Sequence, residues 1–562
     1  MSAQASLEQA LAALDAGPRA AAVERIARLV GEAVLSGRAD FAASALERAL
    51  AIAPAEPALL SRYAAVSKLG GDDAAALRFA LAALDLSPGD AIAAALAVEM
   101  LTDRIELTRA VSLGEACIER DPRAGHVMRA LAQAYLFQGR AHDAQKIALR
   151  AAALVPGNPA AVGAACLSSL YDDTLSASEV AERHRRLGAQ LVPLPAPPFA
   201  AHRRDPSAPI RVGFVSGDIR EHPVGLFVAP LLAAFDRGRI APFVYARGAG
   251  GDALTARVRA LPLAWRDTTA LDDASVLARI RADRIDVLVD LSGHTHGGRP
   301  RLVASRAAPF QASWLGYPHA TGIPQTDALF ADARTVPRDD DAVLRLPAYL
   351  PLPASYHAPD VAPPPSRGGA AFTFGSFNHL AKLSDRTVAL WCEVLRAAPQ
   401  SRLALCALGL ADAGTRERTH RRFAARGVGP ERLLMLPPRG SGAELMEYYG
   451  QVDLALDPLP FNGGTTTLQA LGQGVPTLTL PGATLASRMG LSVLGALGLD
   501  DELVATDAAH YVALAAGWMQ RGERLAELRG GLRGRLLASD ALHPARFAAA
   551  FAALLDGALE RA

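Results

Sequence analysis

One loop of the sequence has the residue types that an anion-binding site requires. The run Phe461-Asn-Gly-Gly-Thr-Thr-Thr-Leu-Gln469 follows the short apolar run Leu454–Asp457 and opens a helical pattern. Glycines such as Gly464 let the backbone approach a ligand closely. Thr465 and Thr466 are predicted to supply N-cap hydroxyls, and the free amides of the first helical turn would donate to phosphate oxygens. A helix that is merely well capped is the alternative interpretation.

The second candidate is a lysine in a chain that otherwise uses arginine. Of the 58 basic residues, only Lys68, Lys146 and Lys382 are lysines. Lys382 ends the run Ser376-Phe-Asn-His-Leu-Ala-Lys382, directly after the apolar run Phe372–Phe377. An ammonium group at this place could contact a diphosphate and stabilise the charge that develops on a leaving nucleotide. A solvated surface lysine is the alternative, but the rarity of lysine in this chain favours a functional role.

A histidine occupies a similar place earlier in the chain. His222 lies in Ser216-Gly-Asp-Ile-Arg-Glu-His-Pro-Val-Gly225, which follows the apolar run Arg211–Ser216. An imidazole there could act as a general base or as a positioning donor near a reacting hydroxyl. A single His-Pro pair in a loop is a weak signal by itself, so its interpretation depends on the surrounding elements.

Two further patterns resemble metal-binding motifs. His294 and His296 have His-x-His spacing, but no third ligand is evident, so we expect polar lining of a cleft. The Asp-x-Asp pattern of Asp339–Asp341 lies in a polar loop between prolines and is interpreted as a solvated turn. The sequence contains no P-loop, GxSxG or kinase signature. It therefore predicts no metal site.

The loops that carry these residues follow short apolar runs, as functional loops do in open parallel sheets. In residues 209–365 the runs are Arg211–Ser216, Ala241–Tyr245, Ile285–Leu291 and Phe310–Gly316. In residues 366–562 they are Phe372–Phe377, Arg402–Cys406, Leu433–Leu436, Leu454–Asp457 and Thr477–Leu480. Helical patterns separate the runs, which is typical of doubly wound α/β sheets. We expect two Rossmann-like domains over these two ranges, with a ligand cleft between them.

The first part of the chain repeats with a period of 34 residues. The series are Pro54, Pro88, Pro122 and Pro156; Gly37, Gly71 and Gly139, interrupted by Ile105; and Ala42, Ala76, Ala110 and Ala144. A glycine between two helices, an alanine where they touch and a proline after the second helix are typical of the tetratricopeptide repeat. An ordinary helical bundle is the alternative. We predict such repeats over residues 1–173, followed by a helix and a proline-rich linker over residues 174–208.

The composition excludes several classes of protein. The 562 residues are 51% hydrophobic and 20% charged, which excludes long disorder. The 58 basic and 57 acidic residues nearly cancel, which argues against a nucleic-acid or anionic-membrane binder. Four dispersed cysteines without a CxxC pair favour a reducing compartment. Because neither a signal peptide nor a bilayer-spanning apolar run is evident, we expect a soluble cytoplasmic protein of undefined oligomeric state.

Five sequence blocks in order resemble the protein O-GlcNAc transferases, including the plant SPINDLY-type enzymes. The blocks are Arg211–Ser216 with His222-Pro223, Ala308–Pro318, Gly375–Lys382, Asn462–Thr467 and Pro481–Arg488. Together with the repeats, the resemblance covers nearly the whole chain. It implies a GT-B fold of two Rossmann-like domains behind an α-solenoid. It also implies metal-independent, inverting transfer of a sugar from a nucleotide diphosphate to serine or threonine of proteins.

The resemblance further implies roles for individual residues. His222 matches the histidine beside the acceptor, whose role is that of a base or a positioning group, and Lys382 matches the lysine on the donor diphosphate. Both are therefore predicted catalytic residues. The predicted donor-binding residues are His379, Gly464, Thr465, Thr466, Gln469, Gly316, Pro318 and Arg488. In the family, the two threonines donate to the phosphates, and the loop with the glycine and the proline lines the sugar side of the cleft.

Three departures from the family pattern concern recognition. Gln469 occupies the position of an acidic residue that commonly holds the ribose hydroxyls. The segment Arg439–Tyr449 lacks the Lys, His and Arg that grip uridine diphosphate in the animal enzymes. The only asparagines are Asn158, Asn378 and Asn462, so the asparagine ladder of the animal repeat groove is missing. The nucleotide base and the mode of acceptor binding therefore stay open.

The sequence thus predicts a glycosyltransferase that moves a sugar to serine or threonine hydroxyls of proteins, with GlcNAc from UDP-GlcNAc as the expected donor. It needs no cofactor, and its partners are the nucleotide sugar and an acceptor protein held by the repeat groove and the interdomain cleft. Among enzymes, the alternatives are transfer of fucose from GDP-fucose or of glucose from UDP-glucose. A repeat scaffold whose GT-B half binds nucleotide without turnover is the alternative of another class.

Overall fold

The computed structural model contains two compact units. It describes residues 3–17, 19–200, 202, 204–248, 250–337, 342–353, 360–437 and 442–561. Met1–Val155 with Asp412–Thr415 form the first unit, and Pro156–Ala411 with Arg416–Ala562 form the second. None of the helices in the described ranges combines the length and the apolar composition that a membrane crossing needs.

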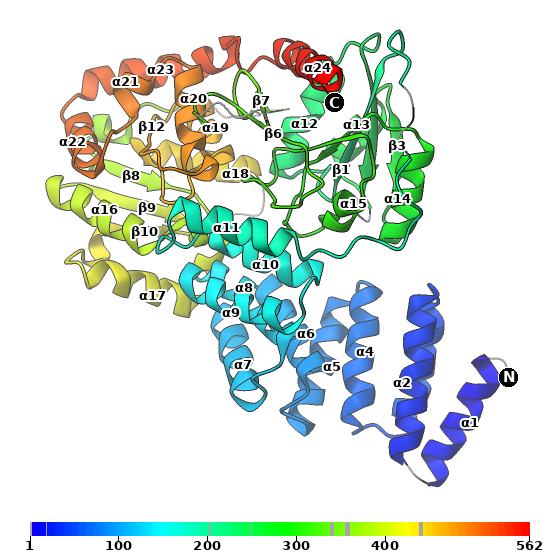
Figure 1. Cartoon of the computed structure of the whole chain (residues 1–562). Coiled ribbons are helices and arrows are strands. Elements are labelled where there is room, and N and C mark those ends of the chain that lie inside the picture. The colour runs from blue at the N-terminus through cyan, green and yellow to red at the C-terminus, as the bar shows by residue number, and fades with distance from the viewer. Residues whose placement is uncertain are drawn as a thin grey trace. The chain divides into compact units, whose positions relative to one another are not determined.

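The first unit is an array of packed helices (Figure 1). Its helices are α1 (Ala3–Ala16), α2 (Arg19–Leu35), α3 (Ala39–Ile52), α4 (Pro57–Leu69), α5 (Asp73–Leu86), α6 (Ala91–Asp103), α7 (Leu107–Arg120), α8 (Gly125–Phe137) and α9 (Ala141–Leu154). The prolines of the 34-residue series follow the ends of α3, α5, α7 and α9 by two residues each, where a proline stops a helix. The predicted helix–turn–helix repeats are confirmed.

The turns between paired helices explain the glycine series. Gly37, Gly71 and Gly139 have left-handed backbone, with φ of 74°, 81° and 70°. Glycine adopts this conformation without steric cost because it has no Cβ. Ile105, where the series is interrupted, has φ of 59°, so the turn keeps its shape with a strained β-branched residue.

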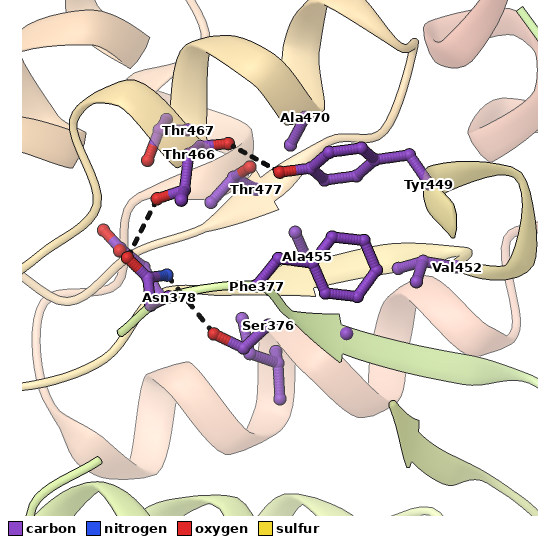
Figure 2. Close-up of a pocket in the computed structure, with 13 residues that line it drawn as sticks. Ser376, Phe377, Asn378, Tyr449, Val452, Ala455, Thr466, Thr467, Ala470 and Thr477 are labelled. Atoms are coloured by element: carbon purple, nitrogen blue, oxygen red, sulfur yellow. Dashed lines mark hydrogen bonds between the residues drawn. The ribbon is translucent and has the colours of Figure 1, made fainter. Parts of the chain in front are cut away.

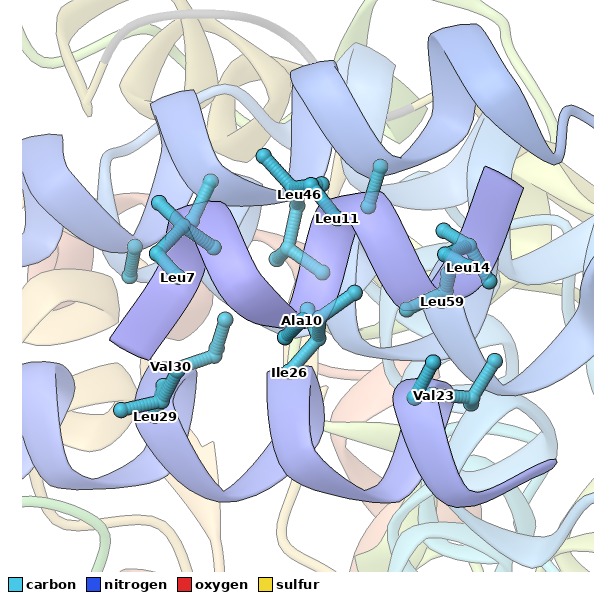
Figure 3. Packing of buried hydrophobic residues seen from close by; sticks show 14 of the residues in the cluster. Leu7, Ala10, Leu11, Leu14, Val23, Ile26, Leu29, Val30, Leu46 and Leu59 are labelled. Atoms are coloured by element: carbon cyan, nitrogen blue, oxygen red, sulfur yellow. The ribbon is translucent and has the colours of Figure 1, made fainter. Parts of the chain in front are cut away.

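Small residues in the repeats allow close approach of the helices. The alanines of the periodic series, Ala42, Ala76, Ala110 and Ala144, are completely buried. Figure 3 shows the first layers of this core, in which Leu11 of α1, Ile26 of α2 and Leu46 of α3 belong to one apolar cluster. Because each layer buries its apolar face against the next, the array depends on neighbouring repeats for its stability.

The second unit contains two lobes, and the first is built on a seven-stranded parallel sheet (Figure 1). The strand order is β3-β2-β1-β4-β5-β6-β7. The strands are β1 (Ile210–Ser216), β2 (Ile240–Ala246), β3 (Ala264–Asp267), β4 (Val287–Asp290), β5 (Phe310–Ser313), β6 (Ala328–Ala331) and β7 (Val343–Arg345), and the helices are α12 (Pro223–Ala234), α13 (Ala253–Arg259), α14 (Asp273–Ala282) and α15 (Pro300–Ala304). Sequence analysis predicted β1, β2, β4 and β5. It missed β3, β6 and β7; β3 and β7 are the edge strands of the sheet, and charged residues interrupt their apolar runs.

The second lobe has a five-stranded parallel sheet in the order β10-β9-β8-β11-β12. The strands, all predicted, are β8 (Thr373–Ser376), β9 (Arg402–Cys406), β10 (Leu433–Leu436), β11 (Leu454–Leu456) and β12 (Thr477–Leu478). The α-helices are α16 (Asp385–Ala397), α17 (Ala413–Ala424), α18 (Gly442–Glu447), α19 (Thr465–Gly472), α20 (Met489–Ala496), α21 (Asp500–Leu503), α22 (Ala508–Met519) and α23 (Gly522–Ala538). Short 3₁₀ helices are η1 (Pro365–Gly368), η2 (Leu380–Lys382), η3 (Leu408–Ala411), η4 (Pro430–Arg432), η5 (Tyr448–Gln451) and η6 (Leu485–Arg488).

The last helix of the chain returns to the first lobe. α24 (Pro544–Arg561) packs against α12 (Figure 1). Phe551 of α24 contacts the rings of Phe214, Phe235 and Phe330, with centroids 6.2, 5.6 and 4.6 Å away. The predicted range 366–562 therefore contains a helix whose aromatic face is buried on the other lobe.

Two helices that precede the lobes also belong to the second unit. They are α10 (Pro159–Ser169) and α11 (Ala177–Gly188). The 34-residue spacing assigned α10 to the repeats, whereas its contacts group it with the two lobes. The regular spacing reports only local structure, and it does not reveal which unit buries the outer face of the helix.

Candidate active site

The loop after β11 leads into α19 and has the local geometry of an anion site. The N-cap residue is Gly464, and no side chain caps the helix. The amides of the first turn therefore have no partner within the helix, and the helix dipole adds a positive potential at this end. The prediction that Thr465 and Thr466 supply the N-cap is wrong, because α19 begins at Thr465 and both hydroxyls lie in its first turn.

Lys382 lies beside this loop, at the end of η2. Its Nζ donates to the Asn462 carbonyl oxygen at 2.8 Å and to Asn378 Oδ1 at 3.3 Å. It also lies 4.3 Å from the centroid of the Phe461 ring. These three partners are neutral, and burial lowers the pKa of the Lys382 ammonium. A partly buried cation whose direct partners are neutral, close to the loop that opens a helix, favours the binding of an anion, and the nearby Asp457 balances its charge only in part because burial raises the pKa of that carboxyl.

Asn378 connects the lysine with the start of α19. Its Oδ1 accepts hydrogen bonds from Lys382 Nζ and, at 2.9 Å, from Thr466 Oγ1, while its Nδ2 donates to Ser376 Oγ at 3.3 Å. Figure 2 shows Thr466 and Asn378 facing one another in the wall of a pocket, with the Tyr449 hydroxyl donating to the Thr466 carbonyl. Sequence analysis assigned no role to Asn378. The available signal was its place next to His379 in a chain with three asparagines.

A buried carboxylate supports the same loop. Asp457 directly follows β11 and is 1% exposed. One of its oxygens accepts from the Gly463 amide at 2.5 Å, and the other accepts from Thr479 Oγ1 at 2.6 Å. Burial raises the pKa of this carboxyl, whereas the two hydrogen bonds and the charge of Lys382 oppose the increase. Asp457 thus holds the backbone of the loop and partly balances Lys382, a role that its position at a strand end could have suggested.

His379 is held in a neutral state next to the lysine. It is the N-cap of η2, and its Nδ1 accepts a hydrogen bond from the Ala381 amide at 3.1 Å. Burial, together with the positive charge of Lys382, lowers the pKa of His379 to about 4. A neutral imidazole can therefore lie beside the ammonium without charge repulsion at neutral pH.

His222 caps a helix in the first lobe. Its Nδ1 accepts from the Val224 amide at 3.3 Å, at the start of α12. The side chain is 38% exposed, and Asp218 Oδ2 lies 3.8 Å from Nδ1. Burial lowers the pKa of His222, although Asp218 opposes this change. Because Nδ1 accepts, the neutral ring carries its proton on Nε2 and can donate from there. This arrangement favours the positioning role over that of a general base.

The Gly316–Pro318 loop after β5 lies against the start of α12. A Cβ atom at Gly316 would be 2.1 Å from the Leu291 carbonyl oxygen and 2.9 Å from Val224 Cγ2. Only glycine therefore permits this approach. The loop is thus brought next to the helix start that His222 caps, while Pro318 is buried.

Two other predicted donor-binding residues lie in the second lobe. Gln469 is partly buried in α19, four residues after Thr465. The guanidinium of Arg488 donates to the Arg334 carbonyl at 2.6 Å and to the Gly482 carbonyl at 3.0 Å. Arg488 thereby connects the lobes, since Arg334 belongs to the first. A contact of either side chain with the donor stays a prediction.

His294 does not line an open cleft, so that expectation is wrong. Its side chain is buried, and its Nε2 is 2.7 Å from the Thr321 carbonyl oxygen. His296 is exposed. In the part of the chain that the structure describes, no three His, Cys, Asp or Glu side chains are arranged for a metal ion. Asp339–Asp341 and residues 439–441 lie outside the described residues.

The structure therefore groups the predicted residues by lobe. Lys382, His379 and Thr466 surround Asn378 in the second lobe, whereas His222 and the Gly316 loop lie together in the first. Two Rossmann-like parallel sheets in one unit, with an anion-binding loop after a strand of the second, define the GT-B class of glycosyltransferase fold.

Comparison with known proteins identifies the family within this class. The model of glycosyl transferase family 41 matches residues 167–351 and 367–549. The chain belongs to this family. The match begins within α10, which agrees with the grouping of α10 and α11 with the two lobes.

Named relatives and a solved structure agree with the family. The chain is 33% identical over 355 residues to "Probable UDP-N-acetylglucosamine--peptide N-acetylglucosaminyltransferase SPINDLY" of Arabidopsis thaliana, covering 61% of this chain and 39% of that protein. It is 28% identical over 344 residues to the SEC protein of the same plant, covering 58% and 35%. It thus spans well under half of these relatives. A mutant of the Thermobaculum terrenum O-GlcNAc transferase matches with a TM-score of 0.81 and 31% identity, over 90% of this chain and 98% of that one.

Proposed function

We propose that the chain transfers a sugar from a nucleotide diphosphate to serine or threonine hydroxyls of proteins, with inversion at the anomeric carbon. One observation carries this proposal. Lys382 Nζ and Thr466 Oγ1 converge on the same oxygen of Asn378, where the uncapped start of α19 adds positive potential. These are the donors that a leaving diphosphate requires, and the residues match those of the family motif.

In the proposed reaction, the acceptor hydroxyl attacks the anomeric carbon while the bond to the diphosphate breaks, and the hydroxyl proton passes to an oxygen of the leaving diphosphate. The electron pair leaves with the diphosphate, whose growing charge is stabilised by Lys382 and by the first turn of α19. This positive potential comes from the protein, so we propose that the step needs no metal ion. His222 would donate from Nε2 to the acceptor oxygen and orient it, because Nδ1 is engaged by the Val224 amide.

UDP-GlcNAc is the proposed donor, because the relatives carry UDP-N-acetylglucosamine in their names. The proposed acceptor is a protein segment that reaches the two lobes and is recognised by the repeats. A reducing, cytoplasmic location is proposed because Cys117, Cys166, Cys392 and Cys406 are all buried free thiols.

A thermal-shift panel on the whole chain tests the proposed function. UDP-GlcNAc, UDP-glucose, GDP-fucose, UDP and GDP are added at about 100 times the expected Kd, which would stabilise the binding unit by about 2.7 kcal/mol. We expect UDP and UDP-GlcNAc to raise the melting temperature by a few degrees, and the Lys382→Ala variant to lose most of this shift. Stabilisation by GDP-fucose or UDP-glucose instead would replace the proposed donor. No shift from any of the five would overturn the proposal, whereas a shift without measurable sugar transfer would support the scaffold alternative.

A further inference from the structure

The segment between the repeats and the lobes contacts both lobes. On the first lobe, His184 of α11 is hydrogen-bonded through Nε2 to the Tyr317 hydroxyl at 2.5 Å. On the second lobe, Asp173 Oδ2 accepts from the Arg386 amide in the first turn of α16 at 2.7 Å. Residues 170–176, which we call the bridging loop, therefore lie against the second lobe between two helices that pack close to the first.

The bridging loop also reaches the aromatic residue next to Lys382. The ring of Tyr171 stacks on the ring of Phe461, with centroids 4.9 Å apart and planes inclined by 10°. Phe461 is 7% exposed, and its ring is the one over which Lys382 Nζ lies at 4.3 Å. Tyr171 is thus connected to the ammonium through one side chain, although it belongs to neither Rossmann-like sheet.

This contact has a direct physical effect on the ammonium. An aromatic face attracts a cation and favours its charged form, most strongly where water is excluded. Two stacked rings are held more rigidly than one, so Tyr171 limits the rotation of Phe461 and keeps water away from it. The remaining contacts of Nζ are two oxygens on one side, the carbonyl of Asn462 and Oδ1 of Asn378. Without the stack, the Lys382 side chain would adopt more conformations, and more water would reach its Nζ.

We propose that Tyr171 is a positioning residue for Lys382, so that a loop outside both Rossmann-like sheets completes the diphosphate site. This inference rests on the proposed function, since it assumes that Lys382 binds the donor diphosphate. Tyr171 itself touches Phe461 and is not a catalytic residue. The titratable groups that act electrostatically on Lys382 or feel its charge are Asp457, which favours the ammonium, and His379, whose pKa the ammonium lowers.

A double-mutant cycle tests the role of Tyr171. Affinities for UDP and GDP are measured by calorimetry on the whole chain, for Tyr171→Leu, Lys382→Ala and the double variant. We expect Tyr171→Leu to weaken binding of the preferred diphosphate about 5- to 20-fold at pH 7, in keeping with the loss of the stacked ring that supports the cation–π contact of Phe461 with Lys382. In the Lys382→Ala background the same substitution should change affinity less than about twofold.

Two further variants separate positioning from general structure. Tyr171→Phe keeps the ring and should bind as the wild type does. Tyr63→Leu removes a ring from the remote pair with Phe79 in the repeats, and should also bind normally. If Tyr171→Leu does not fold, Tyr171→Met, which also removes the stacked ring, makes the same test while Phe461 stays in place.

The pH dependence of binding gives an independent readout. Diphosphate affinity should fall as pH rises through the lowered pKa of Lys382, because the ammonium loses its charge. In Tyr171→Leu more water reaches Nζ; because burial is the main cause of the lowered pKa of Lys382, this gain should exceed the weaker attraction by the Phe461 ring, and the alkaline limb should move to higher pH. The role of Tyr171 would be overturned if Tyr171→Leu weakened diphosphate binding equally in the wild type and in the Lys382→Ala background. It would also be overturned if the alkaline limb of the pH profile did not move. Absence of any diphosphate binding by the wild type would instead overturn the proposed function on which this role rests.

Discussion

The loops after β1 and β8 use the same local device for different purposes. Each follows the first strand of its sheet, and each has a histidine as the N-cap of the next helical turn. His222 accepts from the amide two residues later through Nδ1, and His379 does the same. The local sequence therefore gives the same side-chain cap in both lobes, although the backbone φ is −138° at His222 and −56° at His379.

The two histidines differ in their surroundings. His222 is partly exposed and has the carboxylate of Asp218 nearby. His379 is next to Lys382, and its pKa falls to about 4. The comparison shows that the shared cap determines which ring nitrogen accepts the backbone hydrogen bond. Neighbouring charges and burial determine the pKa of the ring. The first loop has a partly exposed imidazole near a carboxylate, while the second has a neutral imidazole beside a cation.

The largest expected effect comes from removing the charge in the second loop. Lys382→Ala should lower the rate of sugar transfer about 10³-fold, because it removes stabilisation of the leaving diphosphate. The fold should be retained, since a buried ammonium with neutral hydrogen-bond partners adds little to stability. Transfer rates and melting temperatures check both statements. The matched control Lys146→Ala changes an exposed lysine of α9 and should leave both unchanged. A near-normal rate of sugar transfer by Lys382→Ala would contradict the proposed mechanism.

An intermediate effect is expected in the first loop. His222→Asn keeps an acceptor for the Val224 amide but removes the Nε2 donor, so transfer should fall about 10²-fold with little change in donor affinity. The pH profile gives a second check. Protonation of Nδ1 would break the cap, so wild-type activity should decline as pH falls through the pKa of His222, which lies below 6.5. His222→Asn should lack this acid limb. An unchanged limb would assign it to another group and contradict the comparison of the two loops.

The smallest effect on transfer is expected at His379. His379→Asn preserves the cap and removes a titrating ring, so transfer at pH 7 should change less than about threefold. Its effect appears in stability at low pH. A histidine with a lowered folded pKa stabilises the fold above pH 6.5, and this contribution is lost as the unfolded chain takes up protons below that value.

The pKa of about 4 gives a magnitude for this loss. At pH 4.5, His379 should reduce the unfolding free energy of its unit by about 2.5 kcal/mol relative to pH 7. Melting temperatures of wild type and His379→Asn, measured from pH 7 to 4.5, should therefore diverge on acidification, with the variant less sensitive. Parallel curves would show that His379 titrates normally, and the contrast with His222 would disappear.

Much of the fold could be predicted because it follows from local patterns. The 34-residue series of proline, glycine and alanine predicted the helical turns, and the structure explains even its interruption at Ile105. Most strands of both sheets were evident as apolar runs. The edge strands β3 and β7 were missed because charged residues interrupt their apolar runs, and the neighbouring β6 was missed with them. The predicted domain boundaries stay predictions, although α10 and α24 show that helices can be buried on a part of the chain far from their sequence neighbours.

The candidate site also has a part that the sequence could predict and a part that only the fold explains. The sequence by itself determined which loops are candidates for chemistry, because strand ends, the Gly-Gly-Thr-Thr-Thr run and the single lysine of the last 400 or so residues are visible in one dimension. Only the tertiary structure decided that Asn378 joins Lys382 to Thr466, that Asp457 holds the Gly463 amide, and that Tyr171 stacks on Phe461. The physical reason is that residue type and spacing describe what a side chain can do within its own turn. Charge state and orientation depend instead on neighbours that are distant in the sequence, and folding alone brings those neighbours together.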